Sequence, residues 1–136
     1  MKIHIEEFHV ETREQIEVID ITDRVEQVVA RSGVERGFAI IHLPHATAAL
    51  MLNEYELGLV RDFARLVREL FRPGGDWEHN RTDRNAHAHL ASAIIGSTRV
   101  IPVIGSRLAR GTWQNILLLE LDGPRRRRVI VEVVGE

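Results

Sequence analysis

The chain has 136 residues, of which 44% are hydrophobic and 28% are charged, and this composition is typical of a folded globular domain. Its length allows a hydrophobic core without disulfides or a structural metal. The formal net charge of −2 gives no general attraction to nucleic acid or to an anionic membrane. No cysteine is present, which excludes thiolate metal ligands, iron–sulfur clusters and cysteine nucleophiles. We therefore expect a single domain over residues 1–136.

The N-terminal residues alternate between polar and apolar, unlike a secretory signal, and no apolar run approaches the length of a membrane span. A cytoplasmic protein is expected. Lys2 is the only lysine, and a residue at the start of the chain is poorly placed to be buried and activated. This argues against a Schiff-base or pyridoxal phosphate mechanism.

The first third of the chain predicts two strands and a helix. Alternating apolar residues over 3–10 and 15–21 predict an opening β-hairpin. Thr22 is expected to cap a short amphipathic helix that ends at Gly33. Two apolar runs, 37–43 and 46–52, then predict buried strands.

The rest of the chain alternates between helical and strand patterns. Helical periodicity predicts a long helix over 55–71, and a second helix over 86–95 with Asn85 as its cap. The polar residues 76–85 between them predict a loop. Further strands are expected at 99–104, 112–121 and 127–134. Strands that flank two or three helices without a βαβα rhythm predict an α+β fold with a largely antiparallel, sandwich-like sheet.

Three histidines lie in segments that could carry chemistry. His45 lies between two predicted strands, His79 in the polar loop, and His89 in the helix that follows. His87 precedes His89 by two residues, which is about 200° around a helix, so only one of this pair can face a common site. Imidazoles can serve as acids, bases or metal ligands, although their spacing matches no compact zinc motif.

Other polar motifs have structural explanations as well as functional ones. Asn53 and Glu56 could form a capping box at the start of the long helix. The segment Asp122–Arg125 is a predicted turn, and the arginines that begin at Arg125 form either an anion site or a solvated strand entry. Gly111–Gln114 is expected to start a strand.

The order of these motifs resembles that of the YjbQ family, also named the secondary thiamine-phosphate synthase family. The resemblance covers about residues 2–136 and is carried by His45–Leu50, Asn53-Glu54, Glu78–Asn80, Asn85 with Ala88–Leu90, Gly96, Ile101–Val103, Gly111–Gln114 and Asp122–Arg125. It implies a compact α+β fold, a homotrimer, and a polar pocket near a subunit boundary. The family's histidines correspond to His45, His79 and His89, and His87 lies outside the pattern. Ala46 replaces a residue that often carries a hydroxyl group, which leaves Thr47 available.

The family's named activity joins a hydroxymethylpyrimidine diphosphate to a thiazole phosphate and releases diphosphate. The resemblance implies catalytic roles for His45, His79 and His89, which are also the candidate ligands of a divalent Zn or Mg ion. Its implied substrate-binding residues are Thr47, Asn53, Glu54, Asn85, Gln114 and Arg125. The expected partner is a small phosphorylated molecule, with neither nucleic acid nor membrane. The alternative is a homotrimer that binds a metal or a phosphorylated ligand without turnover.

Overall fold

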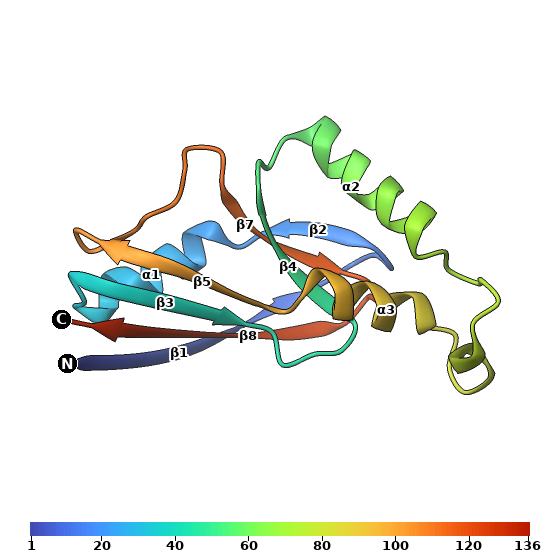
Figure 1. Cartoon of the computed structure of the whole chain (residues 1–136), viewed down its shortest axis with the longest axis horizontal. Helices are drawn as coiled ribbons and strands as arrows, with labels where there is room; N and C mark the ends of the chain where they lie inside the picture. The colour runs from blue at the N-terminus through green and yellow to red at the C-terminus, as the bar shows by residue number, and fades with distance from the viewer.

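The computed structural model describes residues 1–136, which form two antiparallel sheets (Figure 1). The larger sheet has the strand order β1-β8-β3-β5-β6, and the smaller has the order β2-β7-β4. The strands are β1 (Lys2–Glu11), β2 (Glu17–Asp20), β3 (Arg36–His42), β4 (Ala48–Asn53), β5 (Thr98–Ile104), β6 (Arg107–Leu108), β7 (Asn115–Glu120) and β8 (Arg126–Gly135). The helices are α1 (Thr22–Ser32), α2 (Leu57–Leu70), the 3₁₀ turn η1 (Glu78–Arg81) and α3 (Ala86–Ile95). The predicted α+β fold is confirmed.

The main core lies between the two sheets, because alternate residues of their strands point inward. Val129, Val131 and Val133 of β8 are fully buried, whereas the residues between them are more exposed. These valines belong to a cluster of 19 buried residues that also includes the apolar side of α1. A second cluster of nine buried residues joins the other face of the smaller sheet to α2 and α3. The smaller sheet is therefore covered on both faces.

The predicted opening hairpin is wrong. β1 pairs with β8 over ten residues, from Lys2 opposite Gly135 to Glu11 opposite Arg126. β2 pairs instead with β7 in the other sheet. The alternation of apolar residues identifies a strand but does not identify its partner, and the polar segment between the two strands crosses from one sheet to the other.

Both predicted helix caps of the first half are also wrong. Thr22 is the first residue of α1, and its hydroxyl accepts a hydrogen bond from the Ile116 N–H across the core. Asn53 ends β4, and Glu56 itself is the N-cap of α2, where its carboxylate accepts the N–H groups of Gly58 and Leu59. Both helices therefore begin near polar side chains, as predicted. Thr22, however, bonds a residue of β7, and the cap of α2 is Glu56, three residues after Asn53.

Several predicted boundaries agree with the structure. α1 ends at Gly33, which adopts the left-handed conformation with φ of 71° that favours glycine. α3 spans 86–95 as predicted, with Asn85 at the N-cap position although its side chain makes no capping bond.

Gly111–Gln114 is a turn and not a strand start, because the Gln114 side chain accepts the Gly111 N–H. None of the helices is both long enough and apolar enough to cross a membrane.

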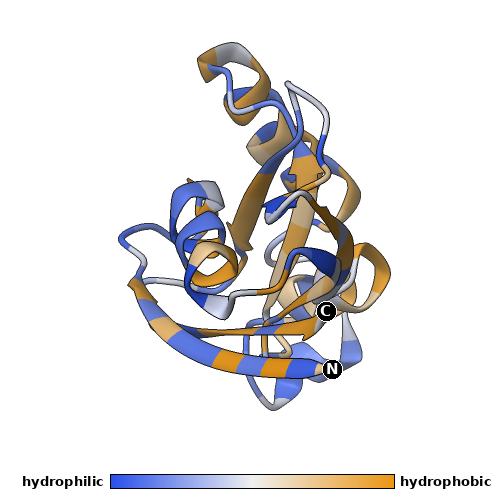
Figure 2. Ribbon diagram, turned by 90° about the vertical axis from the view of Figure 1, so that its left-hand side faces the viewer, coloured by the Kyte–Doolittle hydropathy of each residue, from blue (hydrophilic) through white to orange (hydrophobic).

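The outer face of the larger sheet carries exposed apolar side chains. Ile3 and Ile5 on β1, Phe38 on β3, and Val100 and Ile104 on β5 are between 40% and 65% exposed. Figure 2 shows the alternating hydrophilic and hydrophobic bands along β1, next to the N-terminus. No element of the chain covers this face, and an apolar patch that spans several strands is typical of an interaction surface.

The two-sheet core predicts a strong dependence of stability on Leu50. This residue is fully buried in the main cluster, so Leu50→Ala removes buried methyl groups and leaves a cavity. We expect a loss of about 2–5 kcal/mol in the free energy of unfolding, measured by urea denaturation. Leu57→Ala is the matched control, because Leu57 is 66% exposed and its truncation should cost less than about 0.5 kcal/mol. Equal losses in both variants would contradict this description of the core.

Candidate functional site

The candidate site lies at the end of the molecule opposite the chain termini. Three connections meet there: residues 43–47 between β3 and β4, residues 71–85 between α2 and α3, and residues 121–125 between β7 and β8 (Figure 1). Connecting segments on a rigid sheet are common positions for binding and catalytic residues. Each of the three connections contributes side chains to the site.

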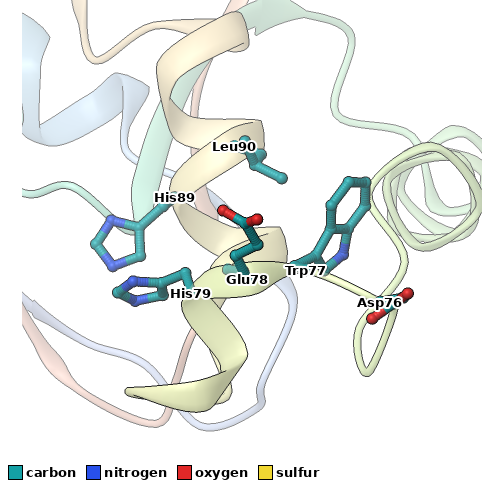
Figure 3. Close-up of a pocket in the computed structure, with 7 residues that line it drawn as sticks. Asp76, Trp77, Glu78, His79, His89 and Leu90 are labelled. Atoms are coloured by element: carbon teal, nitrogen blue, oxygen red, sulfur yellow. The ribbon is translucent and has the colours of Figure 1, made fainter.

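His79 of η1 and His89 of α3 form its centre. Their ring centroids are 4.8 Å apart, and the rings meet edge to face at 73°. The pair lines an open cleft of about 540 Å³ together with Trp77, Glu78 and Leu90. Figure 3 shows the two imidazoles side by side on one side of this cleft and Trp77 on the other. The cleft therefore combines polar imidazoles with an apolar wall.

A chain of hydrogen bonds fixes the orientation of His79. Its Nε2 lies 3.0 Å from the side-chain oxygen of Asn85, and the Asn85 amide nitrogen donates to Asp122 Oδ2 at 2.9 Å. Arg125 in turn donates to the side chain of Asp122 at 2.7 Å and to its backbone carbonyl at 2.8 Å. An amide oxygen can only accept, so Nε2 of His79 carries a proton. In the neutral ring, Nδ1 of His79 is then the free acceptor.

His45 is held in the opposite way. Its Nε2 accepts the backbone N–H of Arg128 at 2.9 Å, so the neutral ring carries its proton on Nδ1 and can donate from there. Burial lowers the pKa of His45, the positive charge of Arg127 lowers it further, and Glu120 opposes both effects. His45 lines a second open cleft of about 550 Å³. His89 and Leu90 line both clefts, so the two clefts adjoin at these residues.

Thr47, a predicted substrate-binding residue, makes its hydrogen bonds inside the protein. Arg127 donates to the Thr47 carbonyl at 2.8 Å and to its hydroxyl at 2.9 Å. The same guanidinium forms two 2.6 Å hydrogen bonds with the carboxylate of Glu120. The side chains of Arg127 and Glu120 are 2% and 0% exposed, so this ion pair lies within the core.

Three predicted substrate-binding residues lie far from the histidines of the same chain. The ladder between β4 and β7 runs from Ala48 opposite Glu120 to Asn53 opposite Asn115. Five residue steps along a strand correspond to about 17 Å. Asn53, Glu54 and Gln114 lie at the far end of this ladder, away from His45. The structure brings Asn85 and Arg125 to the histidines, but not these three residues.

The histidines of one chain do not fit the predicted metal centre. No group of three or more His, Asp or Glu side chains lies in an arrangement that could hold a metal ion. Nε2 of His45 is already an acceptor for Arg128, and its other nitrogen carries the proton in the neutral ring. This arrangement suits the binding of an anionic oxygen better than the binding of a metal.

His87 is structural. It is 1% exposed, and its Nε2 lies 3.2 Å from the Leu121 carbonyl, to which it must donate because a carbonyl can only accept. Its Nδ1 is buried without a hydrogen-bond partner. His87 and His89 thus point in different directions, as their spacing on a helix predicts.

The predicted site did not include Arg127, Glu120 or the bridging role of Asp122. Glu120 could have been suspected from the sequence, because it is the one charged residue in the otherwise apolar run 116–121. A carboxylate in a buried strand requires a cationic partner. Arg127 could not be distinguished from the three arginines beside it, since only the alternation of β8 places it inward.

Comparison with known proteins agrees with the motif order. A sequence model of the family described as UPF0047 protein YjbQ-like matches residues 6–136. The chain belongs to this family. A UPF0047 protein of Archaeoglobus fulgidus is 44% identical over 128 residues, which cover 94% of this chain and 99% of that protein. The UPF0047 protein YugU of Bacillus subtilis is 34% identical, with 93% of this chain and 96% of YugU covered.

Solved structures of the YjbQ-like family share the fold. A YbjQ-like protein from Sulfolobus solfataricus superposes with a TM-score of 0.98 at 47% identity, covering 99% of each chain. A YjbQ/UPF0047 family protein from Clostridium acetobutylicum gives a TM-score of 0.90 at 35% identity, covering 95% of this chain and 99% of that one. The two-sheet architecture is therefore common to family members whose sequences have diverged considerably.

The burial of His87 predicts a loss of stability at acidic pH. Burial lowers the pKa of His87 below its ordinary value of 6.5, so the unfolded chain binds more protons than the folded chain as the pH falls below 6.5. The His87 contribution to stability is complete above pH 6.5 and decreases as the pH falls toward the lowered pKa of the folded state. Urea denaturation between pH 7.5 and 5 should show this decrease.

The variant His87→Gln tests the assignment. Its amide can still donate to the Leu121 carbonyl but cannot titrate, so we expect a shallower dependence of stability on pH than in the wild type. Repeating both series in 1 M salt screens the exposed charges and leaves this desolvation effect in place. Identical pH slopes in the two proteins would rule out His87 as a contributor.

Proposed function

We propose that this protein is a cytoplasmic enzyme of the thiamine-phosphate synthase type, which acts on a small phosphorylated substrate in the cleft of His79 and His89. The observation that carries the proposal is the pair of adjacent imidazoles, 4.8 Å apart, at the wall of an open cleft. The hydrogen bond that His79 donates to the Asn85 side-chain oxygen fixes the orientation of one of these rings. Fixed polar groups that converge on a cleft are the usual mark of a substrate site.

The reaction requires stabilisation of a leaving anion. The bond between the pyrimidine methylene carbon and a diphosphate oxygen breaks, and the diphosphate leaves with the electron pair. A bond forms between the same carbon and the thiazole nitrogen. His45 offers an Nδ1–H donor, and Arg125, which is 49% exposed and linked to His79 through Asp122 and Asn85, offers positive charge. Donors directed at a developing anion are an effective means of catalysis.

The opposite side of the cleft suits the organic part of such a substrate. Trp77 and Leu90 form an apolar wall across from the imidazoles (Figure 3). The Trp77 indole N–H donates to the backbone carbonyl of Arg72, which fixes the position of the ring. A flat heterocycle can pack against such a ring while its phosphoryl groups face the histidines.

The alternative function is binding of a phosphorylated ligand without turnover. One observation favours it: Arg125 already forms an ion pair with Asp122, which reduces the positive charge available for a leaving diphosphate. The same cleft would then retain its ligand through the imidazoles alone. The two functions share one binding site and differ in whether the bond to the diphosphate is broken.

Binding of inorganic diphosphate, measured by calorimetry on protein purified without a histidine tag and treated with chelator, tests the shared site. We expect His89→Ala to weaken binding by about 10- to 100-fold, because each hydrogen bond to a charged group contributes about 1.5–3 kcal/mol. His4→Ala is the matched control and should bind as the wild type does, because His4 lies at the other end of β1, next to the chain terminus, and bonds Glu6. Undiminished binding by His89→Ala would exclude this cleft.

Turnover separates the enzyme from the binding protein. The wild type should restore growth to a strain that lacks thiamine-phosphate synthase, and His89→Ala should not, at equal protein abundance. Restored growth with both proteins would refute a catalytic role for His89. Diphosphate binding without growth, and without product from the purified protein, would support the binding function instead.

We also propose that the chain forms a homotrimer through the outer face of its larger sheet. The family resemblance implies three subunits, and the exposed apolar side chains of β1, β3 and β5 supply a surface that needs cover. The strand β1 at one edge of this sheet pairs only with β8, so the neighbouring subunit can also cover a free strand edge.

Light scattering at micromolar concentration checks the assembly. The wild type should have about three times the 15.5 kDa mass of one chain. Val100→Glu places a charge on the apolar face, where Val100 is 59% exposed, and should shift the mass toward that of a single chain. Leu66→Glu, at a residue of α2 that is 50% exposed, is the control and should keep the wild-type mass. A wild type of 15.5 kDa that is fully active would refute the trimer.

A further inference from the structure

The three connections that meet at the site are all bonded, directly or through one intermediate residue, to the buried ion pair of Arg127 and Glu120. Arg127 belongs to β8 of the larger sheet and Glu120 to β7 of the smaller one. The pair thus joins the two sheets at the end of the sandwich where the site lies. None of its atoms lines either cleft.

One arm of this network leads to His45. Arg127 donates two hydrogen bonds to Thr47, one to the backbone carbonyl and one to the hydroxyl. Thr47 is two residues from His45, and the next residue of β8, Arg128, donates its backbone N–H to His45 Nε2. The middle of the 43–47 loop and its C-terminal end are therefore fixed relative to β8.

The other arm leads to His79 and His89. Glu120 accepts the backbone N–H of Asp122 at 3.1 Å, which fixes the turn after β7. Asp122 then orients Asn85, and Asn85 accepts from His79. The ring of His89 packs against that of His79.

We propose that Arg127 and Glu120 are positioning residues for the proposed substrate site. Arg127 holds the loop in which His45 is an Nδ1–H donor, and Glu120 holds Asp122, which anchors His79 through Asn85. Neither residue touches the substrate. The expected effect on diphosphate binding rests on the proposed function, but the orientation of the histidine rings can be measured without any ligand.

The geometry argues for positioning over simple stabilisation. Removing two charges from water is costly, and an apolar pair of similar volume is often as stable as a buried ion pair. An apolar pair, however, cannot donate to Thr47 or accept from Asp122. A bidentate pair with additional bonds on both partners fixes two loops in direction as well as distance.

The test is the double variant Glu120→Leu with Arg127→Met, which removes both charges together and leaves no uncompensated ion. Two-bond ¹H–¹⁵N spectra of the imidazoles report which ring nitrogen of His45 carries the proton. We expect the Nδ1–H form in the wild type and a shift toward the Nε2–H form in the double variant. Affinity for inorganic diphosphate should fall about 10- to 100-fold, as for loss of a hydrogen bond to a charged group.

Two further variants keep the test decisive. Arg127→Lys retains the charge but cannot bond Glu120 in bidentate fashion and Thr47 at the same time, so it should give intermediate values for both readouts even if the double variant does not fold. Arg65→Met with Glu69→Leu removes an exposed pair on α2 and should change neither. Wild-type His45 spectra in a folded double variant, or in Arg127→Lys, would overturn the proposal. Failure of the wild type to bind diphosphate would remove the proposed function, while the spectra would still decide the positioning role.

Discussion

Arg127 and Glu120 meet in the core between the two sheets, and the rest of the site depends on that contact. A guanidinium and a carboxylate this deeply buried must each be fully hydrogen bonded, since an unpaired charge in the interior is strongly destabilising. The pair satisfies this requirement by bonding to Thr47 and to the Asp122 N–H, which belong to separate loops. The demand of buried charges for partners thus determines where both loops lie.

The loops in turn give the two best-fixed histidines complementary roles. His45 accepts a backbone N–H and presents a donor, whereas His79 donates to Asn85 and, when neutral, presents an acceptor. Identical side chains therefore offer opposite chemistry in the two clefts that His89 lines. A substrate that places an anionic oxygen near His45 and a proton donor near His79 would match both rings. Three histidines that bind one metal would instead all have to present an acceptor nitrogen.

The sequence predicts the elements of this fold better than their connections. Alternation and helical periodicity locate the strands and helices because burial of one face is a local property of the chain. Pairing of β1 with β8, which begins 115 residues after the end of β1 (Glu11 to Arg126), is not local, and the hairpin prediction is wrong for that reason. Asn85 is at the predicted N-cap position, but its side-chain bonds to His79 and Asp122 join residues that only the folded structure brings together. The motif order located the histidines but gave no indication of Arg127.

The burial of His45 also determines how the site responds to pH. Because burial and Arg127 both lower the pKa of His45, the ring stays neutral throughout the neutral range, with its proton held on Nδ1 by the bond to Arg128. A neutral N–H donor binds an anionic oxygen without first acquiring a proton, so this contribution does not vary with pH near neutrality. The positive charge for anion binding must then come from Arg125, whose side chain is 49% exposed. The geometry therefore separates a constant donor, set by the core, from a charge that the surface supplies.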